Sequence, residues 1–298
     1  MHQTRRFAVA LGAVALVCAG CTTAGTVGLQ AASPSTAAVS ASADPSAASS
    51  QSGSASRAGA TSPAASPAQA AAALPLAGKT VGIDPGHDGG NFNDPAFINT
   101  LIWNGRAPET CDTTGTQTAG GYTEAQFNFN VATYLRADLL AAGARVVMTR
   151  HSNQGVGPCV TTRAQIINRA RADVAIDIHA DGGPAYGRGF TVLEPVADGP
   201  NNKVIRASIG FGNDVRAAML AYTSMPESTY YGFGGVIERD DLAGLNLTTV
   251  PKILIECGNM PSATDAALLT SPAFQRLLAR AFTAAIVAFL TGRPIPKG

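Results

Sequence analysis

The stretch VAIDIHAD, residues 174–181, is an apolar run that turns polar at its end. Two other stretches have the same form: VGIDPGH, residues 81–87, and ILIECGN, residues 253–259. Short apolar runs bounded by glycine and polar residues are typical of buried strands. Three such runs, separated by segments with a helical period, predict an α/β layer architecture.

Strand-like and helix-like segments alternate from Leu76 to Gly292. Thr123 and Gln126 fit a capping box at the start of one helix, and Ser271-Pro272 opens the last one. The predicted strands are 79–84, 145–149, 173–178, 189–194 and 250–257, and the predicted helices are 123–142, 161–171, 203–223 and 271–292. We therefore predict a single three-layer α/β domain over residues 76–292, with a mixed, mostly parallel central sheet flanked by helices, and a C-terminal tail at 293–298.

One long segment, residues 88–121, has no convincing period. It follows His87 directly, ends shortly before Glu124, and contains Trp103. A loop of this length inside a compact domain is more often functional than idle. We expect it to lie at the rim of a site, and a disordered insertion is the alternative.

The first quarter of the chain cannot contribute a core. Residues 2–6 are mostly polar and basic, and residues 7–19 form a continuous apolar run, which is the pattern of a secretory signal peptide. These 13 apolar residues are fewer than the roughly 20 that a membrane-spanning helix needs. Ala, Ser, Pro, Thr and Gly dominate the following stretch. We predict a signal peptide over 1–21 and a disordered tether over 22–75.

The segment VCAGC, residues 17–21, resembles a bacterial lipobox, in which Cys21 becomes the lipidated first residue of the mature protein. Cys18 departs from that pattern, where an aliphatic residue is usual. Lipidation and simple secretion therefore both stay open. In either case we expect export to the periplasm or cell envelope. A lipid on Cys21 would anchor the chain to the outer face of the plasma membrane.

The net charge limits the expected binding partners, and the cysteines bear on disulfide formation. The formal net charge is +1, so no strong field favours nucleic acid or an acidic membrane surface. Cys111 and Cys159 lie in Gly/Thr/Pro-rich loops of a chain bound for an oxidising compartment. A disulfide between them would stabilise the fold by roughly 4 kcal/mol, and two free thiols are the alternative. We expect a monomer.

Four residues form the candidate site. His87 and His179 each end a predicted strand, Glu256 follows three apolar residues, and Glu124 lies in the first turn of a predicted helix. Ligand sites of open α/β sheets form at the carboxyl ends of the strands, so these side chains can meet. Two histidines and one glutamate, with an open fourth position, are a known ligand set of catalytic zinc.

Each of these residues also has a simpler interpretation. A histidine after a turn is often a loop histidine with satisfied hydrogen bonds. An acid such as Glu124 in the first helical turn is favoured by the helix dipole alone. Glu256 is different, because a carboxylate after an apolar run is costly to bury unless it is paired, protonated or close to a metal.

Taken together and in order, these motifs resemble the zinc-dependent N-acetylmuramoyl-L-alanine amidases of bacterial cell walls. The resemblance covers residues 76–291 and is carried by IDPGH at 83–87, Glu124 opening a helix, DIHAD at 177–181, residues 250–259, Thr149-Arg150 and Arg163. It implies one zinc ion per chain held by His87, Glu124 and His179, with Glu256 as the catalytic acid/base. The implied reaction is hydrolysis of the amide between N-acetylmuramic acid and L-alanine in peptidoglycan or its fragments, for cell-wall remodelling, division or recycling.

The chain departs from the family pattern in three ways. The long segment replaces a compact glycine-rich loop after His87, Cys257 and Met260 replace the residues usual beside the catalytic glutamate, and no wall-binding repeat is visible. Two alternatives therefore stay open. A zinc carboxypeptidase-like peptidoglycan hydrolase would need an arginine near the site, for which Arg188 and Arg239 are candidates. A non-catalytic wall-binding lipoprotein would not need Glu256.

Overall fold

The computed structural model describes residues 74–298. In this part of the chain, six strands form a sheet in the order β4-β1-β5-β8-β6-β7. All neighbouring strands are parallel except β6 and β8. The strands are β1 (Thr80–Pro85), β4 (Arg145–Met148), β5 (Val174–Asp181), β6 (Thr191–Pro195), β7 (Val236–Arg239) and β8 (Lys252–Asn259). The prediction of a mixed, mostly parallel sheet is confirmed.

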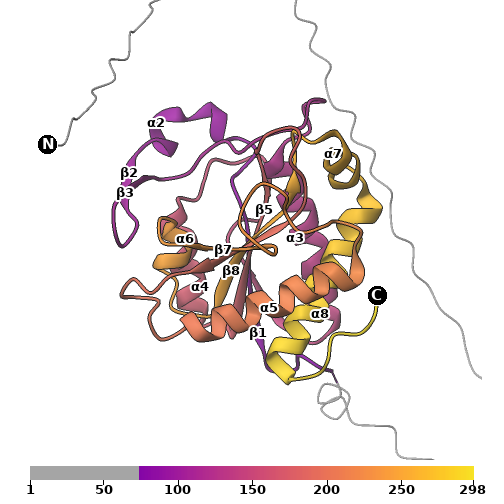
Figure 1. Cartoon of the computed structure of the whole chain (residues 1–298). Coiled ribbons are helices and arrows are strands. Elements are labelled where there is room, and N and C mark those ends of the chain that lie inside the picture. Colours follow the sequence, from indigo (N-terminus) through magenta and orange to yellow (C-terminus); the bar gives the residue numbers. More distant parts are fainter. Residues whose placement is uncertain (1–73) are drawn as a thin grey trace, which may run out of the picture. The chain divides into compact units, whose positions relative to one another are not determined.

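Helices cover both faces of this sheet (Figure 1). On one face lie α3 (Glu124–Ala141), α5 (Ile205–Tyr222) and α8 (Pro272–Thr291), which pack against one another and against the strands. On the other face lie α4 (Val160–Ala170) and α6 (Ala243–Asn246), and α7 (Ala263–Leu269) follows β8. The predicted three-layer α/β fold is therefore confirmed.

The strands are apolar on both sides because both sides are covered. Successive residues of β5 point to opposite faces. Ile176 and Ile178 belong to the main core under α3, α5 and α8, whereas Ala175 packs with Ile167 of α4. The sheet is thus buried between two layers of helices, and only the ends of its strands can form a site.

Helix α8 has the length and composition of a membrane span, but its apolar face packs inside the domain. Phe274, Leu278 and Phe282 are buried in the core that α8 shares with α3 and α5. The predicted helix ends are confirmed. The Ser271 hydroxyl accepts a hydrogen bond from the Phe274 amide, and Gly292 follows the helix with a φ of 70°.

The segment 88–121 is structured, so the alternative of a disordered insertion is wrong. It contains η1 (Asn91–Asn93), α2 (Pro95–Ile98) and an antiparallel hairpin of β2 (Leu101–Trp103) and β3 (Pro108–Thr110). These elements are three or four residues long, which is too short to produce a period in the sequence. The four-residue elements β7 and α6 escaped prediction for the same reason, and the seven-residue helix α7 was also not predicted.

Several predictions concern residues at the margins of the described chain. The predicted signal peptide with Cys21, and the predicted tether except for its last two residues, lie outside the described residues. Ile295, in the predicted tail, packs against the main core. Cys111 and Cys159 are buried free thiols, and burial together with the neighbouring Cys159 thiol raises the pKa of Cys111 to about 12. The structure brings the two cysteines together as expected but contains no disulfide between them.

Two adjacent leucines of α3 test the placement of the core. Leu139 is fully buried, whereas Leu140 is 43% exposed. We expect Leu139→Ala to lower the free energy of unfolding by about 2–5 kcal/mol, because it leaves a cavity. Leu140→Ala should change it by less than about 1 kcal/mol. Urea denaturation followed by circular dichroism measures both values, and equal losses would contradict this packing.

Candidate metal centre

Three of the predicted site residues form one cluster. His87, Glu124 and His179 each offer a donor atom, and these atoms lie within 4.8 Å of one another. The Glu124 Oε1 atom is 3.2 Å from His87 Nε2 and 2.8 Å from His179 Nδ1. One carboxylate therefore lies between two imidazoles, and the three donors can reach a single ion.

The turn after β1 places His87. The backbone of His87 has a φ of 56°, in the left-handed region, which histidine adopts more readily than most residues. A side chain at Gly86 would collide with the His179 ring, so only glycine fits there. The two imidazole rings consequently approach to 4.8 Å between centroids, edge to face.

The start of α3 places Glu124. The Thr123 hydroxyl accepts a hydrogen bond from the Gln126 amide, which confirms the Thr123 half of the predicted capping box. The Gln126 side chain instead donates to Asn130. The amide of Thr116 donates to Glu124 Oε2 at 2.9 Å, and the amide of Ala180 donates to Oε1 at 3.2 Å. These contacts hold the buried carboxylate toward the histidines.

Both histidines are basic in the metal-free protein. Burial alone would lower the pKa of His87, but the Glu124 carboxylate and a hydrogen bond to Asp112 raise it to about 9. Burial also opposes the charged form of His179, and its carboxylate partners Asp177 and Glu124 raise its pKa well above the usual value. A metal ion must therefore displace protons to bind here at neutral pH.

Glu256 faces the same cavity as the cluster. It lies directly opposite His179 in the pairing of β5 with β8. Its Oε2 atom is buried and has no hydrogen-bond partner among the described residues. Burial raises the pKa of Glu256 to about 8. The four predicted residues line one cavity of about 250 Å³, with Arg239 on its wall.

The strands extend further than predicted. β5 continues to Asp181, so His179 lies within its strand rather than after it, and β8, whose predicted range already contained Glu256, continues to Asn259. Backbone pairing resumes after a bulge that follows His179, which keeps both strands in the sheet beyond the site. Among the candidates from β1, β5 and β8, only His87 follows the end of its strand.

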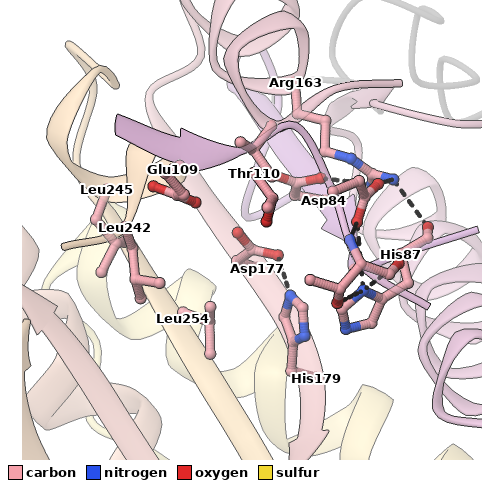
Figure 2. Close-up of a pocket in the computed structure, with 15 residues that line it drawn as sticks. Asp84, His87, Glu109, Thr110, Arg163, Asp177, His179, Leu242, Leu245 and Leu254 are labelled. Carbon is pink, nitrogen blue, oxygen red and sulfur yellow. Dashed lines mark hydrogen bonds and ion pairs between the residues drawn. The ribbon is translucent and has the colours of Figure 1, made fainter. Parts of the chain in front are cut away.

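A second hollow adjoins the cluster (Figure 2). It has a volume of about 180 Å³ and shares His87 and His179 with the first cavity. Glu109 and Thr110 of β3 form part of its wall, together with three leucines, Leu242, Leu245 and Leu254. The segment 88–121 therefore lies at the rim of the site, as expected.

The two candidate arginines have different environments. Arg188 is bound to Asp265, a fully buried carboxylate, at 3.1 Å. Arg239 pairs with Asp241 at 2.6 Å and lines the cavity that contains Glu256. Only Arg239 is therefore placed to contact a ligand there.

The sequence analysis assigned no role to three charged residues behind the histidines, although one of them, Asp177, belongs to the DIHAD motif. These are Asp112, Asp177 and Lys252, all buried. A signal was present, because aspartate and lysine inside apolar strands are rarely buried without partners. Their partners, however, are distant in sequence.

Comparison with known proteins identifies the family. A family model described as N-acetylmuramoyl-L-alanine amidase matches residues 81–288. The chain belongs to this family. The family predicted from the motifs is thereby confirmed, and the members of this amidase family are hydrolases.

Three mycobacterial amidases are similar to this chain. The N-acetylmuramoyl-L-alanine amidase Rv3717 of Mycobacterium tuberculosis is 38% identical over 229 residues, which are 74% of this chain and 90% of that protein. The solved structure of the amidase Ami1 from Mycobacterium smegmatis is 39% identical, with a TM-score of 0.69, over 73% of this chain and 99% of that one. Ami1 from Mycobacterium abscessus is 41% identical, with a TM-score of 0.68, over 72% and 100%.

The raised pKa of His87 makes metal binding dependent on pH. At pH 7 the folded, metal-free amidase keeps a proton on His87, whose pKa is about 9 rather than 6.5. We expect Zn²⁺ binding at pH 7 to release at least one proton, and the affinity to rise about tenfold per pH unit for each proton displaced. Calorimetry in buffers of different ionisation enthalpy measures the release. Heats of binding that do not depend on the buffer would show that no proton is released, and would contradict the raised pKa of His87.

Proposed function

We propose that this amidase hydrolyses the bond between the lactyl group of N-acetylmuramic acid and L-alanine in peptidoglycan or its fragments. In this proposal His87, Glu124 and His179 hold one zinc ion, and Glu256 is the catalytic acid/base. Family membership supports the reaction. The arrangement of the four side chains in one cavity supports their roles.

The observation that carries the proposal is the buried, unpartnered Oε2 atom of Glu256. A carboxylate in such a position is costly unless it is protonated or works beside a cation. It lines the same cavity as the three-residue cluster, which offers two imidazoles and one carboxylate. That donor set matches catalytic zinc, which takes three protein ligands and leaves one position open.

The chain's own residues define the mechanism. Bound zinc would supply Lewis-acid chemistry, polarising the scissile carbonyl and making a water molecule more acidic. Glu256 Oε2 accepts the proton of the attacking water and then donates it to the departing amine of L-alanine. A pKa of about 8, raised by burial, suits a group that must both accept and release a proton near neutral pH.

Family membership favours the amidase over the carboxypeptidase alternative. The wall-binding alternative is disfavoured, because a binding protein has no use for an unpartnered carboxylate beside a metal cluster. We further propose that the protein is exported to the cell envelope and acts there as a monomer. In an oxidising compartment, the adjacent thiols of Cys111 and Cys159 would form the predicted disulfide.

Replacement of Glu256 tests the catalytic role. We expect Glu256→Gln to lower kcat by about 10²- to 10⁴-fold, because the amide cannot accept the proton. Zinc content should stay at one per chain, because Glu256 is not among the proposed ligands. Product mass spectrometry with a muramyl peptide measures turnover, and metal analysis measures zinc.

Glu194→Gln is the matched control, because Glu194 is another buried carboxylate whose pKa burial raises, to about 7, but it does not line the cavity. We expect the control to retain activity. The wild type should release sugar and an intact peptide that begins with L-alanine. Release of a C-terminal amino acid would support the carboxypeptidase alternative. Full activity of Glu256→Gln would refute the assigned role.

A further inference from the structure

Lys252 is a charged residue in the centre of the fold. It lies on β8, four residues before Glu256, and its side chain is only 1% exposed. Lysine is almost never buried to this extent without a partner. Its Nζ atom is 2.7 Å from Asp84 Oδ2 and 2.9 Å from Asp177 Oδ2. Two carboxylates from two other strands therefore share one ammonium group.

Asp84 connects Lys252 to a second buried cation. The Asp84 Oδ1 atom accepts hydrogen bonds from Thr149 at 2.6 Å and from Arg163 Nη1 at 3.2 Å. The other terminal nitrogen of Arg163 donates to Asp112 Oδ2 at 3.2 Å. Figure 2 shows Arg163 reaching Asp84 behind the histidines. The charges alternate in sign along this chain of contacts.

Each end of this series of contacts reaches one of the two histidines. Asp112 Oδ1 is 3.3 Å from His87 Nδ1, and Asp177 Oδ1 is 3.3 Å from His179 Nε2 (Figure 2). Asp177 Oδ1 is buried and has no well-aligned hydrogen-bond donor among residues 74–298. The His179 ring is thus the group it is placed to meet. The complete charge chain runs His87, Asp112, Arg163, Asp84, Lys252, Asp177 and His179.

The arrangement gives each imidazole one defined orientation. The nitrogens that face the charge chain are His87 Nδ1 and His179 Nε2, and the opposite nitrogens both face Glu124. His87 Nδ1 also lies 3.1 Å from the Thr113 carbonyl, an acceptor, so this nitrogen carries a proton. A carboxylate or carbonyl behind a metal-binding histidine is known to fix its tautomer and raise its basicity.

A gain in stability alone is a weak explanation for burying the residues of this charge chain. Buried ion pairs often contribute no more than apolar side chains of the same volume, because desolvation offsets their attraction. Three strands, β1, β5 and β8, nevertheless each contribute one charged residue to it. A role at the metal centre explains both why these charged residues are buried and why their contacts run from one histidine to the other.

We propose that this charge chain positions the metal-binding nitrogens of both histidines, with Asp177 and Lys252 acting on His179, and Asp112 and Arg163 acting on His87. These are positioning residues and none of them needs to touch the substrate. The inference rests on the proposed metal centre. It predicts that loss of one link weakens metal binding even where the fold persists.

The first test is the zinc affinity of Asp177→Asn in the full-length protein, measured by competition with a chelator. We expect binding to weaken by about 10- to 100-fold, the usual effect of removing a partner behind a metal ligand. The visible spectrum of the Co²⁺-loaded variant should change, because the His179 ring is no longer held. Asp265→Asn is the control, since it removes a fully buried, ion-paired carboxylate elsewhere and should leave zinc affinity unchanged.

A second pair of variants separates positioning from stability. Lys252→Met leaves Asp84 and Asp177 without their shared cation and should destabilise the fold strongly. Adding Asp177→Asn relieves this, because Asp84 keeps Arg163, so the melting temperature of the metal-free double variant should recover. Its zinc affinity should stay as weak as that of Asp177→Asn.

Wild-type zinc affinity in Asp177→Asn and in the double variant would overturn the inference while leaving the metal centre in place. If zinc affinity recovers together with the melting temperature, the charge chain only stabilises the fold and does not position the histidines. Failure of the wild type to bind zinc would instead refute the metal centre itself.

Discussion

The register between β5 and β8 is the constraint on which the site depends. It places His179 directly opposite Glu256, and parallel pairing of β1 with β5 brings the turn at Gly86 beside them. A shift of one residue would turn these side chains to the other face of the sheet. The buried apolar residues of the three strands hold this register, so the core fixes the geometry of the chemistry.

Burial has opposite consequences for the acids at this site. Glu124 accepts hydrogen bonds from two backbone amides and contacts both imidazoles, whereas Glu256 Oε2 has no hydrogen-bond partner among the described residues. Burial opposes the charged form of Glu124, but the two histidines hold its pKa well below the usual value, whereas burial raises the pKa of Glu256 to about 8. In the proposed mechanism, the same site thus contains both the metal ligand Glu124 and the acid/base Glu256.

The sequence predicts the strands, the long helices and the four site residues, because each leaves a local signal. His179 and Glu256 stand out against apolar neighbours, and Glu124 follows a helix cap. The hairpin of β2 and β3 leaves no period, because its strands have three residues each. The pairing of Lys252 with Asp84 spans 168 positions, and no local pattern encodes such a contact.

The central claim is that one metal ion is held by His87 Nε2, Glu124 and His179 Nδ1, beside a free Glu256. A crystal structure of the zinc-loaded protein, with anomalous scattering at the zinc edge, tests this directly. We expect one peak at about 2.0–2.1 Å from those two nitrogens, with Glu256 outside the ligand shell. A zinc ion bound by the opposite nitrogens, a zinc ion with Glu256 among its ligands, or a zinc ion located elsewhere would contradict this claim.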